Sequence, residues 1–432
     1  MARKMKDSGI EWIGEIPEGW EITRLKYLAD FEPTCDTSYL TDESKVTYTP
    51  MECVKNGGFE NRSALYGNLS HTLTPFQNGD IAMAKVTPCF ENGNIAIMDN
   101  LFSGFGLGSS ELFIFRSKSI STRYFFYWLQ NKAFVARACS TMTGTGGLKR
   151  ISPSFIRNCP VHCPSTDEQT KISDYLDAKC SKIGDLLTSV HASIEEYKKL
   201  KQAVITQAVT KGVRGEREMK DSGNPWFGQI PTDWKLSRVG LHFSIILGKM
   251  LCNAPLNDTY TLEPYYCAAD VHFDGVTDGE RKKMWFSPIE KDLYRVSVGD
   301  LLVVEGGAGA GGSAIVEKQD SDTYVQNSIM IVRSKGNADN RYLRYLLEFL
   351  VKQGYIDVVC NKATIPHFTK DKLSCVPFCL CPTGEQKEIA DYLDAKCAEI
   401  DGLIAKKEQL VKELESYKKS LIYEVVTGKR EV

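Results

Sequence analysis

Several features common in enzymes and membrane proteins are missing from this sequence of 432 residues. Its apolar runs fall well short of the ~20 residues that cross a bilayer, and the opening Met-Ala-Arg-Lys leads into a polar stretch unlike a signal peptide. Its six histidines are scattered, without the neighbours expected of a catalytic triad. We therefore expect a cytoplasmic, non-catalytic chain that does not enter a membrane.

Two glycine-rich segments lack the residues that would make them cofactor sites. EGGAGAGGS (305–313) resembles a phosphate-binding loop, but no lysine precedes Ser313, so it is not a Walker A motif. FSGFG (102–106) matches the F-x-G-x-G of S-adenosylmethionine-dependent methyltransferases. The chain has no Asn/Asp-Pro-Pro-Tyr/Phe tetrapeptide to hold a flipped adenine, so we interpret FSGFG as a turn beside a strand.

The fourteen cysteines come without a secretory leader, which favours reduced, buried thiols. Two clusters could be read as metal sites: Cys159 with His162 and Cys163, and Cys375 with Cys379 and Cys381. Neither has the C-x-x-C spacing of a zinc knuckle, and each lies in a short apolar run before a helix start. We expect strand residues facing a core, and no metal.

What the chain does contain is one module used twice. DYLDAKC occurs at 174–180 and again at 391–397, and Glu168-Gln169 recurs as Glu385-Gln386, also 217 positions later. Near the start of each half, MKDSG (5–9) returns at 219–223 with an offset of 214. A period of about 215 residues is too long for a solenoid repeat, so each copy is a domain with its connection.

The repeated DYLDAKC segment is predicted to lie on a long helix. Thr166-x-x-Gln169 and Thr383-x-x-Gln386 have the form of capping boxes, and Pro164 and Pro382 precede them. Apolar residues then recur at steps of three and four, which predicts two amphipathic helices of about 40–45 residues that pair antiparallel. Residues 166–214 hold eight Lys/Arg and seven Asp/Glu, a balance that favours a solvated or partner-binding face over a DNA clamp.

Between the helices each half has the pattern of a mixed α/β domain. Alternating apolar residues and turn signals predict strands at 80–84, 93–98, 110–115, 300–304, 313–317 and 328–333. An aromatic helix follows in each half, at 121–138 and 340–354, with its aromatic stripe in the core. The loops differ between the copies, as expected of two domains that recognise different things.

The net charge of −2 does not indicate nucleic acid, but its distribution does. Residues 112–166 contain eight Lys/Arg and no Asp or Glu, which predicts a surface that faces a polyanion. Within it, TMTGTGGLKRIS (141–152) offers exposed backbone followed by Lys149-Arg150, suited to phosphate contact. The alternative is an ordinary glycine turn with solvated cations. The counterpart NKATIPHFTKDK (361–372) is less basic.

Together these segments resemble the specificity subunits of Type I DNA restriction–modification systems (HsdS). The resemblance covers nearly the whole chain. It rests on DSG-x-x-W-x-G-x-IP-x-x-W in both halves, the P-x-x-x-EQ and P-x-x-EQ helix entries, and three further segments. Those segments are NGDIAMAKVTPCFENGNIA (78–96), GSSELFIFRS (108–117) and VGDLLVVEGGAGAGG (298–312).

The resemblance implies an α+β fold with two similar α/β target recognition domains in a pseudo-two-fold arrangement, separated by a pair of long antiparallel α-helices. We expect recognition domains at 1–164 and 214–382, and the long helices at 165–213 and 383–432. Each domain would read one half of a bipartite double-stranded DNA site. The helices would dock two methyltransferase subunits that carry S-adenosylmethionine and modify adenine, so this chain would bind no cofactor itself. A restriction subunit could join them.

Candidate site residues follow from the same segments. Candidate DNA contacts are Lys85, Thr87, Asn92, Asn94, Ser109, Ser110, Thr145, Lys149, Arg150, Gly309, Gly311, Ser313, Gln326, Asn327, Lys362 and His367. Candidate partner contacts are Tyr175, Asp177, Lys179, Tyr392, Asp394 and Lys396.

The exact repetition of DYLDAKC is interpreted as a common docking face for two copies of one partner, because a symmetric pair needs matched surfaces. Helix packing alone would explain the tyrosines and leucines of the motif equally well. It would not explain Asp177 and Lys179, or their counterparts in the second copy.

Two other functions remain open at this point. One is a self-contained S-adenosylmethionine-dependent adenine methyltransferase, against which the missing Pro-Pro motif counts. The other is a helical scaffold without a DNA role, against which the acid-free stretch counts.

The two ends of the chain reproduce its internal junction. TGKREV (427–432) followed by MARKMKDSG (1–9) matches the pattern of TKGVRGEREMKDSG (210–223). We therefore predict that the ends lie close together, as in a ring opened at one of two equivalent places.

Overall fold

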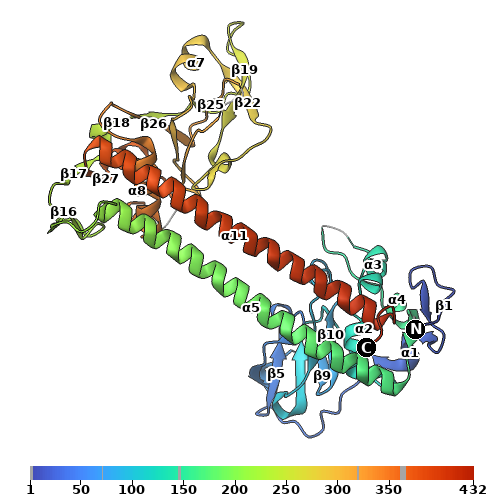
Figure 1. Cartoon of the computed structure of the whole chain (residues 1–432). Coiled ribbons are helices and arrows are strands. Elements are labelled where there is room, and N and C mark those ends of the chain that lie inside the picture. Colours follow the sequence, from blue (N-terminus) through green and yellow to red (C-terminus); the bar gives the residue numbers. More distant parts are fainter. Residues whose placement is uncertain (1–2, 71, 145–146, 319–320, 361–365) are drawn as a thin grey trace. The chain divides into compact units, whose positions relative to one another are not determined.

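The computed structural model describes residues 3–70, 72–144, 147–318, 321–360 and 366–432 (Figure 1). It divides into two compact units, residues 1–191 with 408–432 and residues 192–407. We call them the first and second unit. Each combines one mixed α/β domain with part of each of two long helices, α5 (Thr166–Lys211) and α11 (Thr383–Val426). Among the described residues, no helix is long and apolar enough to span a membrane.

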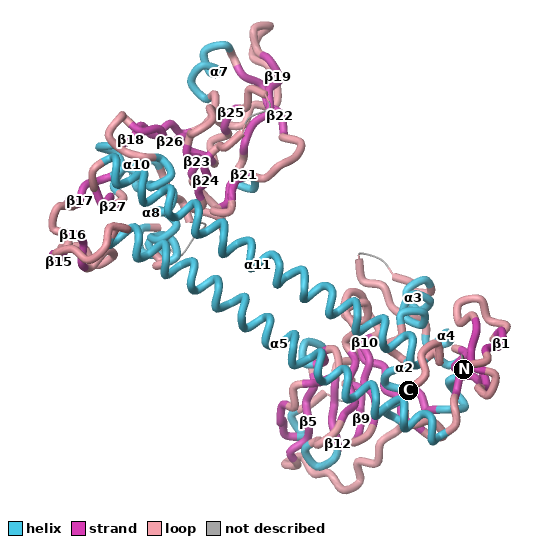
Figure 2. Tube along the Cα trace, in the orientation of Figure 1, coloured by secondary structure: helices cyan, strands magenta, loops and turns pink. Residues whose placement is uncertain are grey.

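The two long helices run antiparallel within each unit (Figure 2). In the first unit Leu176, near the start of α5, shares a core with Ile422 and Val425, near the end of α11. In the second unit the end of α5 packs with the start of α11 through Ile205 and Leu393. Their apolar steps of three and four thus bury the stripe that the sequence predicted, and the expectation of an antiparallel pair is confirmed.

The helix entries differ from the capping boxes that we expected. Thr166 is the first residue of α5, so Ser165 is the N-cap, and its Oγ accepts from the Glu168 N–H at 3.4 Å. Gln169 does not close a capping box. Its Oε1 accepts from the Ser121 N–H at 2.8 Å and its Nε2 donates to the Pro164 carbonyl at 3.0 Å. The glutamine therefore joins the start of the aromatic helix to the turn before α5.

The first unit contains two four-stranded sheets, ordered β11-β10-β13-β4 and β8-β5-β12-β9. Neighbouring strands are antiparallel except β12 with β5, where Gly106 lies opposite Thr47. The strands of these sheets are β4 (Ala29–Phe31), β5 (Lys45–Thr49), β8 (Arg62–Leu65), β9 (Thr74–Gln77), β10 (Asp80–Ala84), β11 (Ile95–Met98), β12 (Phe105–Gly108) and β13 (Leu112–Ser117). Two-stranded sheets pair β1 (Met5–Asp7) with β2 (Glu15–Pro17), β3 (Glu21–Arg24) with β14 (Pro160–Cys163), and β6 (Val54–Lys55) with β7 (Gly58–Phe59).

The second unit repeats this plan with one sheet reduced. Its sheets are ordered β18-β26-β23-β24 and β22-β19-β25. Their strands are β18 (Phe243–Leu247), β19 (Thr261–Tyr266), β22 (Lys282–Phe286), β23 (Leu301–Val304), β24 (Ser313–Ile315), β25 (Tyr324–Val325) and β26 (Ile329–Ser334). The smaller pairs are β15 (Met219–Asp221) with β16 (Gln229–Pro231), β17 (Lys235–Arg238) with β27 (Pro377–Leu380), and β20 (Val271–His272) with β21 (Gly275–Val276).

Most of the shorter helices recur in both units, and one of them differs from the prediction. In the first unit they are α1 (Leu25–Leu28), α2 (Thr122–Trp128), α3 (Lys132–Ser140) and α4 (Pro153–Asn158). In the second they are α6 (Val239–His242), α7 (Pro288–Tyr294), α8 (Asn340–Lys352), α9 (Tyr355–Val359) and α10 (Lys370–Cys375). The single helix expected at 121–138 is wrong. It breaks after Trp128 because Asn131 caps a new helix, accepting from the Phe134 N–H at 2.9 Å.

The core of each unit lies between sheet, aromatic helix and long helix. In the first unit Phe115 of β13, Phe125 of α2 and Leu176 of α5 are all buried in one cluster. The aromatic stripe is therefore core, as predicted. FSGFG forms a turn (Phe102–Gly104) that leads into β12, which is also as expected. Gly106 is required there because a Cβ would come within 2.2 Å of the Phe76 ring.

The described ends of the chain meet at Trp20 in the first unit. The Arg3 guanidinium lies 5.2 Å from the centre of the Trp20 ring. Gly428, just past the end of α11, is so close that a Cβ there would lie 3.1 Å from the same ring. In the second unit the internal junction meets Trp234 in the same way, with Arg217 at 6.0 Å and Gly212 beside the ring. This is the arrangement that the tail-to-head match predicts.

A buried histidine holds the end of α11 in the first unit. His162 lies on β14, stacks on Trp20 with ring centres 5.6 Å apart, and bonds through Nε2 to the Val426 carbonyl at 2.8 Å. Its Nδ1 is buried without a hydrogen-bond partner among the described residues. Burial lowers the pKa of His162 to about 4. The counterpart in the second unit is the buried Cys379.

We expect His162 to make the first unit acid-sensitive. Its pKa is lower in the folded state than the ~6.5 of an unfolded chain, so the stability it contributes is present above pH ~6.5 and is lost as the pH falls towards 4. By pH 5 the loss should be about 2 kcal/mol. Urea denaturation of wild type and His162→Cys between pH 7 and 5 measures it. Equal slopes against pH in the two proteins would contradict this assignment.

Candidate DNA and partner interfaces

Three backbone hydrogen bonds join segments of the first unit that contain predicted DNA contacts. They run from the end of β10 to the turn before β13 and to the strand-like segment before α4, with N···O distances of 2.9–3.0 Å: Lys85 N–H to Glu111, Ile151 N–H to Lys85, and Thr87 N–H to Lys149. We call residues 85–87, 111 and 149–151 the first frame.

The second unit has the same three bonds, and we call residues 305–307, 328 and 366–368 the second frame. Its N–H to carbonyl bonds are Glu305 to Ser328 (2.8 Å), Phe368 to Glu305 (2.6 Å) and Gly307 to Pro366 (3.2 Å). The bonds pair the two frames position by position: Lys85 with Glu305, Thr87 with Gly307, Glu111 with Ser328, Lys149 with Pro366 and Arg150 with His367. One backbone arrangement thus carries different side chains in the two units.

Side chains of the first frame leave cations at the surface. Thr87 Oγ1 accepts from the Lys149 N–H at 2.9 Å and donates to the Gly147 carbonyl at 2.9 Å, which fixes the segment that carries Lys149. Arg150 makes a bidentate pair with Glu111, with Nε at 2.9 Å and Nη2 at 2.6 Å from the carboxylate. This pair raises the pKa of Arg150 and lowers that of Glu111. Both cations are exposed.

The second frame is less charged. His367 has 62% of its side chain exposed, and its Nδ1 lies 3.8 Å from the carboxylate of Glu305. Gly306 lies so close to His367 that a Cβ there would be 3.2 Å from Nδ1. The predicted contacts Thr145 and Lys362 lie outside the described residues.

The remaining predicted DNA contacts are placed unevenly. Asn92, Ser110 and Gly309 are exposed, whereas Asn94, Ser109, Gln326 and Asn327 are half-buried. Gly311 is buried, and a Cβ there would meet Ile356 at 2.9 Å. The Ser313 side chain is fully buried in β24. Burial is at odds with DNA contact by these last two residues, and we remove them from the candidate set.

In the acid-free stretch, residues 112–166, fewer cations are unpaired than its composition indicated. Four of its cations pair with acids elsewhere in the chain: Arg116 with Asp80, Lys118 with Asp30, Arg123 with Asp174 and Asp177, and Arg150 with Glu111. Two more, Lys132 and Arg157, lie over the rings of Tyr423 and Phe31. Lys149 and Arg137 remain exposed. Lys132 and Arg157 are also exposed and keep their charge, so the surface expected to face a polyanion narrows to these four residues and the outer part of Arg150.

The two aspartates of each DYLDAKC copy fasten the long helix to its own domain. Asp177 accepts from the Tyr127 hydroxyl at 2.6 Å and from Arg123 Nε at 2.7 Å, and Arg123 also pairs with Asp174 at 2.8 Å. Asp394 accepts from Tyr345 at 2.7 Å and from Arg341 at 2.7 Å, and Arg341 pairs with Asp391 at 2.8 Å.

We call these contacts the Asp–Arg–Tyr clamp. They give Asp177 and Asp394 a structural role within each unit, whereas the sequence had suggested that packing could not explain why these residues are repeated. The identity of the two copies therefore does not by itself require a partner. Of the other candidate partner contacts, Lys179, Lys396 and Tyr392 are exposed and Tyr175 is half-buried. The role of all six residues in partner binding stays a prediction.

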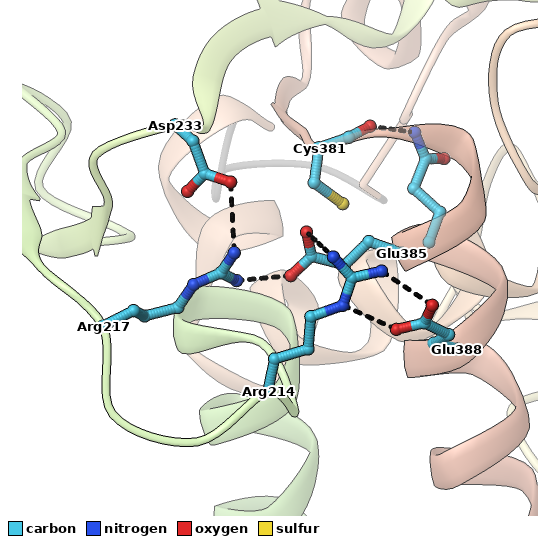
Figure 3. A network of polar contacts seen from close by, with 7 residues as sticks. Arg214, Arg217, Asp233, Cys381, Glu385 and Glu388 are labelled. Carbon is cyan, nitrogen blue, oxygen red and sulfur yellow. Dashed lines mark hydrogen bonds and ion pairs between the residues drawn. The ribbon is translucent and has the colours of Figure 1, made fainter.

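A second fastening, which the sequence did not reveal, surrounds the repeated glutamate (Figure 3). Glu385 is fully buried and pairs with Arg217, which also donates to Asp233 at 3.1 Å. Arg214 makes a bidentate pair with Glu388, both distances 2.7 Å, and lies 3.7 Å from Glu385. In the first unit Glu168 takes this place and accepts from the Trp20 indole N–H at 2.9 Å.

Each unit also has an ion pair between a buried aspartate and an arginine at its sheet, which the sequence did not predict. Asp80 accepts from Arg116 Nε and Nη2, both at 2.8 Å, and Asp300 accepts from Arg333 at 2.8 and 2.7 Å. The Gly-Asp and Arg-Ser dipeptides, which recur in both halves, are the sequence feature from which these ion pairs could have been predicted.

The cysteine clusters show no metal-binding geometry. Within the described ranges, no three His, Cys, Asp or Glu side chains are grouped as metal ligands would be. Cys159, Cys379 and Cys381 are buried, and burial raises the pKa of each thiol. They are core residues of the strand that precedes each long helix or of the turns beside it.

Comparison with known proteins identifies the family of this chain and solved structures that share its fold. A model described as the Type I restriction modification DNA specificity domain matches residues 17–196 and 232–413. The specificity subunits of the Type I restriction enzymes EcoEI and EcoAI of Escherichia coli are 34% and 36% identical over 163 residues. This match spans 37% of the chain but only 27% of those relatives. A putative MjaX specificity subunit of Methanocaldococcus jannaschii is 24% identical over 96% of the chain and 95% of its own length.

Two solved structures share the fold. A chain from a study entitled "Structural basis underlying complex assembly and conformational transition of the type I R-M system" matches with a TM-score of 0.73, 18% identity, and coverage of 96% of this chain and 99% of the other. The HsdS subunit from Thermoanaerobacter tengcongensis matches with a TM-score of 0.52, 17% identity, and coverage of 96% and 98%.

We expect the clamp to stabilise each unit independently of any partner. Tyr127→Phe removes a hydrogen bond to a carboxylate and should lower the free energy of unfolding by about 1.5–3 kcal/mol. Tyr345→Phe should do the same in the second unit, whereas Lys179→Ala, on the exposed side, should change it by less than about 0.5 kcal/mol. Urea denaturation measures all three. Additive effects of Tyr127→Phe and Asp177→Ala in a double-mutant cycle would contradict the clamp.

Proposed function

Because this chain belongs to the family of Type I restriction modification DNA specificity domains, we propose that it is the DNA-specificity subunit of such a system. It would read a bipartite DNA site with its two recognition domains and catalyse no reaction itself. Its partners would be two modification subunits, which would hold S-adenosylmethionine and methylate adenine, and a restriction subunit where one is present. The proposed place of work is the cytoplasm.

One observation carries this proposal: the same frame occurs in both units with different side chains. A repeated scaffold with changed surface residues suits two domains that read two different half-sites. Each long helix carries the identical DYLDAKC segment near its start, which suits docking of two identical partners. A self-contained methyltransferase is not favoured, because FSGFG is a turn and strand packed against Phe76 and offers no loop to a cofactor.

Sequencing of DNA modification in a host tests the proposal. A strain that expresses this chain with its modification subunits should carry methylated adenine in one bipartite motif. The same strain without this chain should lack that motif. Methylation that persists unchanged without the chain, or that appears in a contiguous motif, would contradict the function.

Salt dependence tests the narrowed DNA surface. In the assembled complex, Lys149→Ala should weaken binding and reduce the slope of log affinity against log salt by about 1, because one fewer counterion is released. Adding Arg150→Ala should change that slope little, since Glu111 already neutralises Arg150. Lys118→Ala is the matched control, because Lys118 is a cation of the same stretch that pairs with Asp30 at 2.5 Å. An unchanged slope for Lys149→Ala would remove this residue from the DNA interface.

A further inference from the structure

The two frames allow residue-by-residue comparison of the recognition domains, although their loops differ in sequence. Three matching hydrogen bonds fix Arg150 and His367 at one equivalent position, each directly before the residue whose N–H donates to the carbonyl at the end of the central strand. An isolated bridge pairs each of them with the residue after that strand end, Val86 with Arg150 and Gly306 with His367. The equivalence of the two positions therefore rests on main-chain contacts that both frames share.

At this position each domain places a nitrogen-bearing side chain at the surface beside a carboxylate. Arg150 is 48% exposed and His367 is 62% exposed. The carboxylates are less exposed, 30% for Glu111 and 20% for Glu305. They also come from different places: Glu111 precedes β13, whereas Glu305 follows β23. The frame position equivalent to Glu111 is Ser328, so the second domain supplies its acid from another strand.

An acid thus lies beside the frame position in both domains, hydrogen-bonded to Arg150 in the first and 3.8 Å from His367 Nδ1 in the second. An acid behind an arginine restrains the guanidinium and leaves the remaining N–H groups directed outward. A restrained guanidinium recognises guanine through O6 and N7, and a bidentate contact of this kind discriminates against other bases by roughly 1–3 kcal/mol, about 5- to 150-fold. An imidazole has two ring nitrogens, and one of them faces Glu305, so it offers a single contact.

Resting on the proposed function, we propose that Arg150 and His367 occupy the equivalent base-reading position of the two recognition domains, with Glu111 and Glu305 as their positioning residues. Arg150 reads a guanine in one half-site. His367 makes a single, weaker contact to one base pair in the other half-site. Lys149 contacts phosphate and contributes affinity without sequence information.

Loss-of-contact variants test the first half of this inference. In the complex with its modification subunits, Arg150→Ala should reduce discrimination about 5- to 150-fold at one G·C pair of one half-site and leave the other half-site unchanged. Glu111→Gln should weaken discrimination at the same pair, because the arginine is no longer held. Lys118→Ala should leave both half-sites unchanged. Selection from a DNA library randomised in both half-sites measures every position at once.

A gain-of-contact variant tests the second half without depending on lost stability. His367→Arg places a guanidinium beside Glu305 and should create a new preference for guanine, about 10-fold, at one pair of the other half-site. The unaltered half-site serves as the internal control for folding and assembly in each case.

The outcomes separate this inference from the function on which it rests. Wild type that selects no bipartite site would overturn the proposed function. Suppose that wild type selects a bipartite site but Arg150→Ala and His367→Arg keep its specificity, or change it in both half-sites. That result would overturn the base-reading position and leave the proposed function standing. A salt slope that falls for Arg150→Ala while specificity is kept would reassign Arg150 to phosphate and overturn it as well.

Discussion

The attachment of each long helix to the aromatic helix of its own domain is the constraint on which the rest of each unit depends. Gln169 accepts from the N–H of Ser121, the residue before α2, and two turns later Asp177 accepts from Arg123 and Tyr127 on that helix. The second unit repeats both contacts with Gln386 and Asp394. Between the polar contacts lies a buried leucine, Leu176 or Leu393. Hydrogen bonds to charged groups are worth about 1.5–3 kcal/mol each, enough to fix one helix on the other.

This attachment explains which parts of the sequence are repeated and which are not. The residues that fasten helix to domain recur almost letter for letter, because each has a partner with a required geometry. The frame residues recur only as backbone: the same N–H and carbonyl groups meet in both units while lysine is exchanged for glutamate and arginine for histidine. A frame held by main-chain bonds tolerates such exchanges, since the three bonds common to both units involve no side-chain atom.

The sequence predicted the long helices and most strands of one sheet in each unit, but it did not predict the sheets β8-β5-β12-β9 and β22-β19-β25 or the side-chain partners. Apolar steps of three and four placed α5 and α11, and alternation placed β10, β13, β23 and β26 within two or three residues, because both patterns are local. The break at Asn131 was missed because an asparagine cap competes with continuing helix by one hydrogen bond. Partners such as Asp177 for Arg123, 54 positions away, or Glu111 for Arg150, 39 away, are set by the tertiary fold and leave no local pattern.

Because the partners of charged side chains are set by the tertiary fold, the charge of a surface cannot be predicted from the composition of one segment. An acid-free segment of 55 residues would be a basic surface only if its cations found no acids elsewhere, and the fold brings Asp30, Asp80, Asp174 and Glu111 to four of them. Linear composition therefore measures where acids are absent from the chain, whereas a DNA surface depends on where they are absent in space. In the first unit the two criteria agree at Lys149, which lies in the acid-free segment, is exposed, and is held in place through its own backbone by Thr87.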